Sequence, residues 1–216
     1  MIIQTKLSLP KHYDSNHAYP LILCNDGELR HLQTLKEKAI LVGLLPENRL
    51  TDYTPWHAEA IRPDTENFGG QADEYHNELF NNVLPELQSR YSIDTNEIIY
   101  GGYSLGGLAA VYSLYRTNIP SAVFSICGSF WYPDFVNFCK ENPVINQNAS
   151  VYLCNGKAEG IHHHNILDTA PQCAEKIHAL IHKQLNSITS VLDEFGHHEN
   201  LTNRYKVLSD WLEKQL

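Results

Sequence analysis

The stretch Gly101-Gly-Tyr-Ser-Leu-Gly-Gly107 contains the pattern Gly-x-Ser-x-Gly, with Ser104 at its centre. The apolar run 97–100 in front of it predicts a buried strand, and the Ala- and Leu-rich run 108–116 after it predicts a buried helix. A strand, a tight turn and a helix are the setting of a nucleophile elbow, in which flanking glycines make room for a strained serine. The sequence therefore predicts that Ser104 presents its hydroxyl at the end of a sheet.

Short apolar runs recur along the chain, and several are continuous, as expected for strands that are covered on both faces. Helical patterns lie between them, so the sequence predicts an α/β sandwich with a mostly parallel sheet. A chain of 216 residues is expected to form one domain, 1–216. The predicted strands are Ile2–Leu9, Tyr19–Cys24, Ala39–Leu44, Glu97–Tyr100, Ser121–Ile126, Ser150–Cys154 and Ser187–Leu192.

Apolar residues at three- or four-residue spacing predict three further helices. The first covers Tyr75–Leu87, and Pro85 is expected to kink or restart it. The second covers Ala174–Leu185, with Asp168 as a candidate cap in front of it. The third covers Leu201–Leu216 and ends the chain.

Composition limits the classes of partner. The formal net charge is -9 and the 16 basic residues are scattered, which argues against nucleic acid as a main partner. No apolar run approaches the length of a membrane span of about 18 residues, and no signal peptide is evident, so a cytoplasmic protein without membrane contact is expected. The oligomeric state cannot be deduced from the sequence.

The five cysteines are odd in number, and no pair has the spacing of zinc ligands. Cys24, Cys127 and Cys154 fall in or beside apolar strand-like runs, so they are expected to be buried free thiols. Free thiols are typical of a reducing compartment.

A serine hydroxyl needs a histidine to take its proton, and that histidine needs an acid to orient it. After an elbow of this kind the chain order is serine, acid, histidine. His197 follows the last predicted strand and precedes the last helix, so it is the predicted base, with its neighbour His198 as the alternative.

The acid is expected in a loop that follows a strand after the elbow. Glu159 comes shortly after the strand Ser150–Cys154 and is the predicted acid, with Asp168 and Asp193 as alternatives. The run His162–His164 lies nearby, but adjacent histidines on a loop rarely all point at one ion. Neither a metal nor another cofactor is therefore expected.

Two backbone amides should stabilise the oxyanion of an acyl-transfer reaction. The amide of Leu105 lies at the start of the predicted elbow helix, where the helix dipole favours negative charge. The second is expected from the loop after Tyr19–Cys24, at Glu28 or a neighbour.

Several aromatic side chains are predicted to line a substrate site. The irregular stretch 46–73, which contains Trp56, is long enough to form one of its walls. Tyr103 precedes the elbow serine, and Trp131 follows the strand after the elbow helix, at the same edge of the sheet. If His197 is the base, His198 is expected to line the pocket or to help cap the last helix.

Five blocks in order along the chain resemble the Putative esterase family of α/β-hydrolases, which includes enterochelin-esterase-like proteins, esterase D and the mycolyltransferases. The Asp-Gly of the first block and the Arg and Asp-Tyr-Thr-Pro of the second are the more specific signals. The blocks are 19–27, 49–56, 101–107, 156–159 and 196–200.

The resemblance implies an α/β-hydrolase fold and hydrolysis of carboxylic esters. By matching position it implies Ser104, His197 and Glu159 as nucleophile, base and acid, although the acid varies in the family and some members use a serine–histidine pair. It also implies an oxyanion amide at Glu28 and a substrate wall formed by Arg49, Tyr53 and Trp56.

The leading hypothesis is a serine esterase that cleaves a small-molecule ester through an acyl-enzyme. No inserted lid is evident between the elbow and the histidine. Two alternatives keep the fold: an acyltransferase that passes the acyl group to an alcohol, and an inactive binding protein on a hydrolase scaffold.

Overall fold

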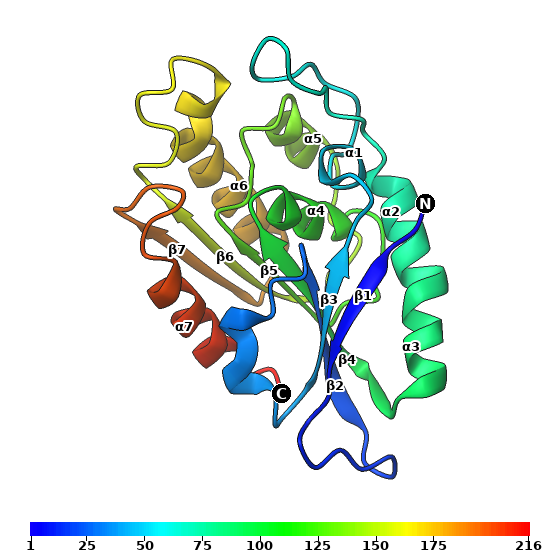
Figure 1. The fold of residues 1–216 in the computed structure, drawn as a ribbon. Helices are drawn as coiled ribbons and strands as arrows, with labels where there is room; N and C mark the ends of the chain where they lie inside the picture. Colours follow the sequence, from blue (N-terminus) through cyan, green and yellow to red (C-terminus); the bar gives the residue numbers. More distant parts are fainter.

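The computed structural model describes residues 1–216, which form a seven-stranded sheet with helices on both faces (Figure 1). The strand order is β1-β3-β2-β4-β5-β6-β7. Only β1 is antiparallel to its neighbour, and every other pair is parallel, so the predicted sandwich is confirmed. The strands are β1 Gln4–Ser8, β2 Tyr19–Asn25, β3 Ile40–Leu45, β4 Ile93–Tyr103, β5 Ala122–Ile126, β6 Ser150–Gly156 and β7 Ile188–Asp193.

Each predicted apolar run contributes to one of these strands, and the helices fill the connections between them. Short 3-10 helices cover Arg30–Leu35 and Ile166–Thr169, and a π turn covers Leu79–Val83. The α-helices are α1 Arg49–Asp52, α2 Ala72–Glu78, α3 Leu84–Arg90, α4 Leu105–Ser113, α5 Phe135–Glu141, α6 Ala170–Gln184 and α7 Leu201–Leu212.

The two faces of the sheet are covered unequally. Helices α2 to α6 pack on one face and enclose the larger core, whereas α7 and the 3-10 helix Arg30–Leu35 cover the other face. Every residue of α4 is buried, because this helix lies between the sheet and its neighbours. Because both faces are covered, the central strands carry apolar residues at successive positions, as the sequence indicates.

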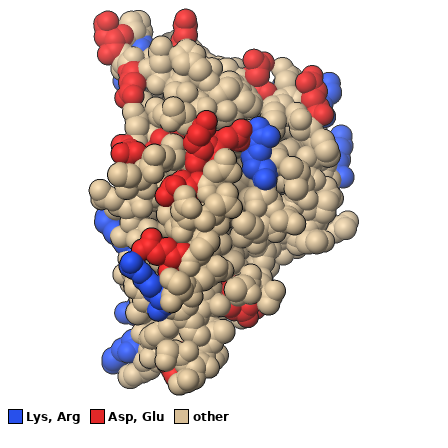
Figure 2. All heavy atoms as spheres, turned by 90° about the vertical axis from the view of Figure 1, so that its right-hand side faces the viewer, with Lys and Arg blue, Asp and Glu red and all other residues tan.

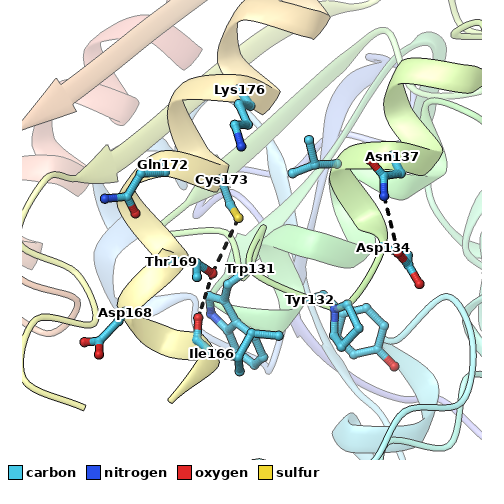
Figure 3. A pocket seen from close by; sticks show the side chains of 12 residues that line it. Trp131, Tyr132, Asp134, Asn137, Ile166, Asp168, Thr169, Gln172, Cys173 and Lys176 are labelled. Atoms are coloured by element: carbon cyan, nitrogen blue, oxygen red, sulfur yellow. Dashed lines mark hydrogen bonds between the residues drawn. The ribbon is translucent and has the colours of Figure 1, made fainter. Parts of the chain in front are cut away.

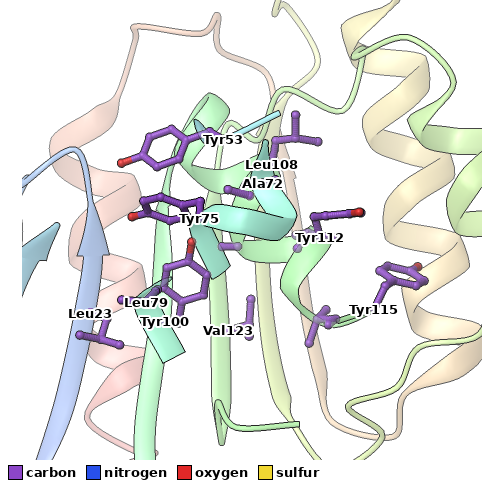
Figure 4. Close-up of a cluster of buried hydrophobic side chains, with 14 of the residues drawn as sticks. Leu23, Tyr53, Ala72, Tyr75, Leu79, Tyr100, Leu108, Tyr112, Tyr115 and Val123 are labelled. Atoms are coloured by element: carbon purple, nitrogen blue, oxygen red, sulfur yellow. The ribbon is translucent and has the colours of Figure 1, made fainter. Parts of the chain in front are cut away.

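The larger core is rich in tyrosine (Figure 4). Tyr53 and Tyr75 meet edge to face, with ring centroids 5.2 Å apart. The hydroxyl of Tyr75 donates to Asn25 Oδ1 at 2.9 Å, and Asn25 Nδ2 donates to the hydroxyl of Tyr100 at 2.9 Å and to the carbonyl of Gly106 at 2.8 Å. This buried network ties the end of β2 to the first turn of α4.

The predicted helix 75–87 is present but interrupted. A π turn separates α2 from α3, and Pro85 stands in the first turn of α3. Proline has no amide hydrogen and its ring collides with the carbonyl four residues earlier, so the wider turn accommodates it. The expectation that Pro85 interrupts this helix is confirmed.

Two details of the other helices differ from prediction. Asp168 does not cap α6: Asn165 caps the preceding 3-10 helix through the amide of Leu167, and Asp168 instead accepts from the amide of His163. The last helix ends at Leu212 rather than Leu216, because its final residues form a turn. The stretch 46–73 is mostly irregular, although it contains α1.

None of the helices combines the length and the apolarity needed to cross a bilayer. On the face that carries α2 and α3, basic side chains stand singly or in small groups among acidic ones (Figure 2). All five cysteines are free and four are buried, including Cys24, Cys127 and Cys154, as predicted.

Candidate active site

Ser104 occupies the turn between β4 and α4 with φ 58° and ψ −122°, a backbone conformation that is costly for a residue with a side chain. A Cβ on Gly102 would lie 2.8 Å from the Gly106 backbone, and one on Gly106 would lie 2.8 Å from Asn25 Cβ. The structure therefore confirms both expectations: Ser104 is strained, and glycine is required two residues before it and two residues after it.

Ser104, His197 and Glu159 form one line of hydrogen bonds. His197 Nε2 lies 3.1 Å from Ser104 Oγ, and His197 Nδ1 lies 2.7 Å from Glu159 Oε2. Glu159 can only accept as a carboxylate, so Nδ1 carries the proton and Nε2 is left to accept from the serine hydroxyl. The side chain of Glu159 is 4% exposed and that of His197 is 24% exposed.

The carboxylate of Glu159 is also held by residues at the end of β6, shortly before it in the chain. Its Oε1 accepts from the amide of Gly156 at 2.6 Å and lies 3.4 Å from Asn155 Nδ2. Asn155 also donates to the carbonyl of Gly128 and faces His178 Nε2 at 3.2 Å. Burial lowers the pKa of His178 to about 4, so this histidine is neutral and serves as a hydrogen-bonding support.

The two alternative acids are engaged elsewhere. Asp193 pairs with Arg204 through both carboxylate oxygens, and Asp168 accepts from the amide of His163. Burial alone would raise the pKa of Asp193, but hydrogen bonds and charge from Arg204 outweigh it and lower that pKa below its ordinary value. Only Glu159 among the three candidates contacts His197.

Tyr103 holds the loop that carries the histidines. Its hydroxyl donates to the carbonyl of His197 at 2.8 Å and lies 2.8 Å from His198 Nδ1. Because the hydroxyl has one proton, Nδ1 of His198 must donate to the phenol oxygen. Burial, and to a smaller extent the neighbouring His197, lowers the pKa of His198. His198 is therefore directed to Tyr103 rather than to Ser104.

One oxyanion donor is in position at the elbow. The hydrogen bonds of α4 begin with the amide of Leu108 donating to Ser104, so the Leu105 amide at the helix start has no acceptor within the helix. Ser129 Oγ lies 3.3 Å from Ser104 Oγ and adds a second polar group beside it.

The profile of the family described as Putative esterase matches residues 3–200. The chain belongs to the Putative esterase family. It is accordingly a carboxylic ester hydrolase, which confirms the class implied by the five sequence blocks.

By sequence the chain is similar to YbbA of Bacillus subtilis (strain 168), described as an uncharacterized protein. It is 27% identical over 169 residues, which cover 71% of this chain and 68% of YbbA. Among solved structures, an IroE-like serine hydrolase from Shewanella oneidensis has a TM-score of 0.80 at 19% identity, covering 96% of this chain and 78% of that one.

The enterobactin hydrolase IroE in complex with DFP has a TM-score of 0.70 at 16% identity, covering 99% of this chain and 88% of that one. These likenesses show the α/β-hydrolase fold predicted from the sequence.

A cavity of about 360 Å³ opens beside Ser104 in this esterase. Every member of the hydrogen-bonded line reaches it, together with Leu105 and three of the predicted substrate contacts, Arg49, Trp131 and His198. The guanidinium of Arg49 is fixed by Asp26, at 3.0 and 3.1 Å.

Four predicted site residues lie outside this cavity, and three of them support it instead. Tyr53 is fully buried and its hydroxyl accepts from the amide of Asp26, so it cannot form a substrate wall. Trp56 donates to the carbonyl of Pro133 and packs on other aromatic rings. Tyr103 points at the histidine loop, as described above.

Glu28 is the fourth. Its carboxylate pairs with Arg30 and its carbonyl faces the thiol of Cys24, and the residue does not line the cavity. Because Glu28 does not line the cavity, the Leu105 amide is the one predicted oxyanion donor that lies beside Ser104.

Sequence reasoning missed several cavity residues individually. The sequence did point to the segments that carry them: some lie in the irregular stretch 46–73, and the others follow β5 and β6. Nothing in their spacing distinguishes them from the neighbours that point elsewhere. They are Leu50, Ile61, Arg62, Phe68, Ser129, Gly160, His163, Leu167 and Ala170.

Cys127, Glu159 and His197 place potential metal-ligand atoms within 4.8 Å of one another. His197 already uses Nδ1 toward Glu159, and Arg204 Nη1 donates to Cys127 Sγ at 2.7 Å. Burial raises the pKa of the Cys127 thiol, and the adjacent guanidinium opposes a second cation. The trio therefore does not fit a metal ion.

Proposed function

We propose that this protein is a serine esterase that cleaves small-molecule carboxylic esters through an acyl-enzyme intermediate. The observation that carries the proposal is the line of hydrogen bonds from Ser104 through His197 to Glu159, beside an open cavity. Such a line lets an ordinary hydroxyl act as a nucleophile at neutral pH.

In the first half-reaction, Ser104 Oγ attacks the ester carbonyl carbon while His197 Nε2 takes its proton. Glu159 stabilises the imidazolium that forms through the hydrogen bond from Nδ1. The carbonyl oxygen becomes an oxyanion and accepts from the Leu105 amide. One such donor contributes about 3 kcal/mol to lowering the barrier.

The tetrahedral intermediate then breaks the bond to the alcohol oxygen, which receives the proton from His197. An acyl ester remains on Ser104. Water enters the cavity, His197 takes its proton, and the resulting attack releases the carboxylic acid and restores the serine hydroxyl.

The strain at Ser104 supports this role. A non-glycine residue at φ 58° costs about 1–3 kcal/mol and persists only where the surrounding structure enforces it. Here the strain directs the hydroxyl toward His197 and places the Leu105 amide beside it, so a single turn supplies both nucleophile and oxyanion donor.

We also propose a cytoplasmic location. The support is the set of five free cysteines, four of them buried, since free thiols persist in reducing compartments. Fractionation of the source cells, with the protein followed by antibody, tests this, and recovery outside the cytoplasmic fraction would refute it.

The catalytic proposal is tested by hydrolysis of p-nitrophenyl esters, from acetate to octanoate, by wild type and Ser104→Ala. IroE is described as an enterobactin hydrolase, so a siderophore ester belongs in the same panel. Ser89→Ala, on the exposed end of α3, is the matched control. Activity that is lost only in Ser104→Ala supports the serine mechanism, and activity retained in that variant refutes it.

A further inference from the structure

A second cavity of about 570 Å³ lies next to the catalytic one, between α5 and α6 (Figure 3). Apolar and aromatic side chains line it, with Trp131 beside Ile166 and with Tyr132 nearer to Asp134. Cys173 and Lys176 reach it from α6. It opens at the same edge of the sheet as Ser104, where the loops after β5 and β6 end.

The partition between the two cavities is thin. Trp131 lines both of them. The 3-10 helix Ile166–Thr169 also contributes to both, since Leu167 faces the catalytic cavity whereas Ile166 and Thr169 face the second one. One indole ring and one helical turn therefore stand between the two cavities.

We propose that the cavity between α5 and α6 is a second substrate subsite, which holds an apolar group of an extended ester while its scissile carbonyl lies at Ser104. This inference rests on the proposed esterase function. It assigns a substrate class: esters whose apolar part extends several bonds beyond the carboxyl group.

The chemistry of the walls determines what this subsite binds. Charges of both signs surround it, from Asp134, Asp168 and Lys176, so they give little net preference for an ion. The apolar lining is the consistent feature: Trp131 is 9% exposed, and the half-buried side chains of Val136 and Ile166 lie beside it in the cavity wall. Such apolar surface binds aliphatic or aromatic groups by removing them from water.

Cys173 provides a selective way to block this cavity. It is the one cysteine of the five that is not buried, and its Sγ lies 3.6 Å from Thr169 Oγ1 on the cavity wall. A bulky maleimide such as fluorescein maleimide should therefore react here and fill the cleft between α5 and α6.

The test compares p-nitrophenyl acetate with p-nitrophenyl 6-phenylhexanoate, before and after labelling with fluorescein maleimide. Labelling should lower kcat/KM for the extended ester by about tenfold, the effect of returning about two methylene groups to water. The acetate ester ends before the partition, so its kcat/KM should change less than about twofold on the same scale.

Cys173→Ser, treated with the same reagent, should show no change on treatment for either ester. Cys173→Trp fills the cleft without any reagent and should reproduce the selective loss. An equal response of both esters, or no response of the extended ester to either block, overturns the subsite. Hydrolysis that persists in Ser104→Ala would instead overturn the esterase proposal, so the two failures are distinguishable.

Discussion

The guanidinium of Arg204 pairs with both oxygens of the Asp193 carboxylate, with Nε to Oδ2 at 2.7 Å and Nη2 to Oδ1 at 2.5 Å. Arg204 is 2% exposed, so this charge lies almost wholly inside the protein. Its Nη1 donates to the carbonyl of Gly196 at 3.1 Å, one residue before His197. The pair therefore fixes the loop that presents His197 to Ser104.

Replacing Arg204 with methionine should be strongly destabilising, because it leaves the Asp193 carboxylate partly buried without its partner. The free energy of unfolding should fall by about 3–5 kcal/mol, measured by urea denaturation. Lys206→Met, which removes an exposed charge from the same helix, is the control and should cost less than about 1 kcal/mol. A similar loss in both variants would show that the buried pair has no special importance.

Glu159→Gln should impair catalysis while leaving the fold intact. An amide can donate to Nδ1 and so favours the wrong tautomer of His197, and it cannot stabilise the imidazolium. We expect kcat/KM to fall by a factor of about 10³ to 10⁴. Glu175→Gln, on the exposed side of α6, is the matched control. If Glu159→Gln stays within about tenfold of wild type, the protein works as a serine–histidine pair.

Tyr103→Phe removes the hydroxyl that holds the carbonyl of His197 and faces His198. Loss of one such hydrogen bond costs about 0.5–1.5 kcal/mol, so kcat should fall by roughly three- to tenfold. KM should change little, because Tyr103 does not line the catalytic cavity. Steady-state kinetics measure both constants. A rise in KM with unchanged kcat would show that Tyr103 contacts the substrate instead of holding the histidine loop.

Acid should destabilise the fold through two buried histidines. Burial lowers the pKa of His178 to about 4 and that of His76 to about 3, from an ordinary value of 6.5. Below pH 6.5 the unfolded chain therefore binds protons that the folded one excludes, so the free energy of unfolding falls as pH falls toward 4.

Each of these histidines contributes a slope of about 1.4 kcal/mol per pH unit in that window. Urea denaturation between pH 7 and pH 4.5 should thus give a shallower slope for His178→Gln than for wild type. Equal slopes would show that the imidazole of His178 is not kept neutral by the fold.

Much of the fold could be predicted, because a parallel sheet covered on both faces leaves continuous apolar runs in the sequence. All seven runs form strands, and Ser104 stands at the turn that its glycines indicated. The chain order of an elbow hydrolase also limited the base and the acid to a few candidates, and the two preferred ones, His197 and Glu159, meet in the structure.

The orientation of side chains could not be predicted in the same way. Tyr53, Trp56 and Trp131 are all aromatic residues in loops near the elbow, yet only Trp131 reaches the catalytic cavity. The importance of Arg204 was also hidden, because a helix pattern marks apolar positions as inward and charged ones as outward. A buried ion pair breaks that rule, and only tertiary contacts reveal it.

The most direct test of the central claim is the site of covalent modification by a fluorophosphonate. Peptide mass spectrometry of the wild type should find a single phosphonate on Ser104, accompanied by loss of ester hydrolysis. Ser104→Ala should remain unlabelled, and Ser89→Ala should be labelled as the wild type is. Labelling at another residue, or full ester hydrolysis by a wild-type protein that carries the phosphonate on Ser104, would contradict the account.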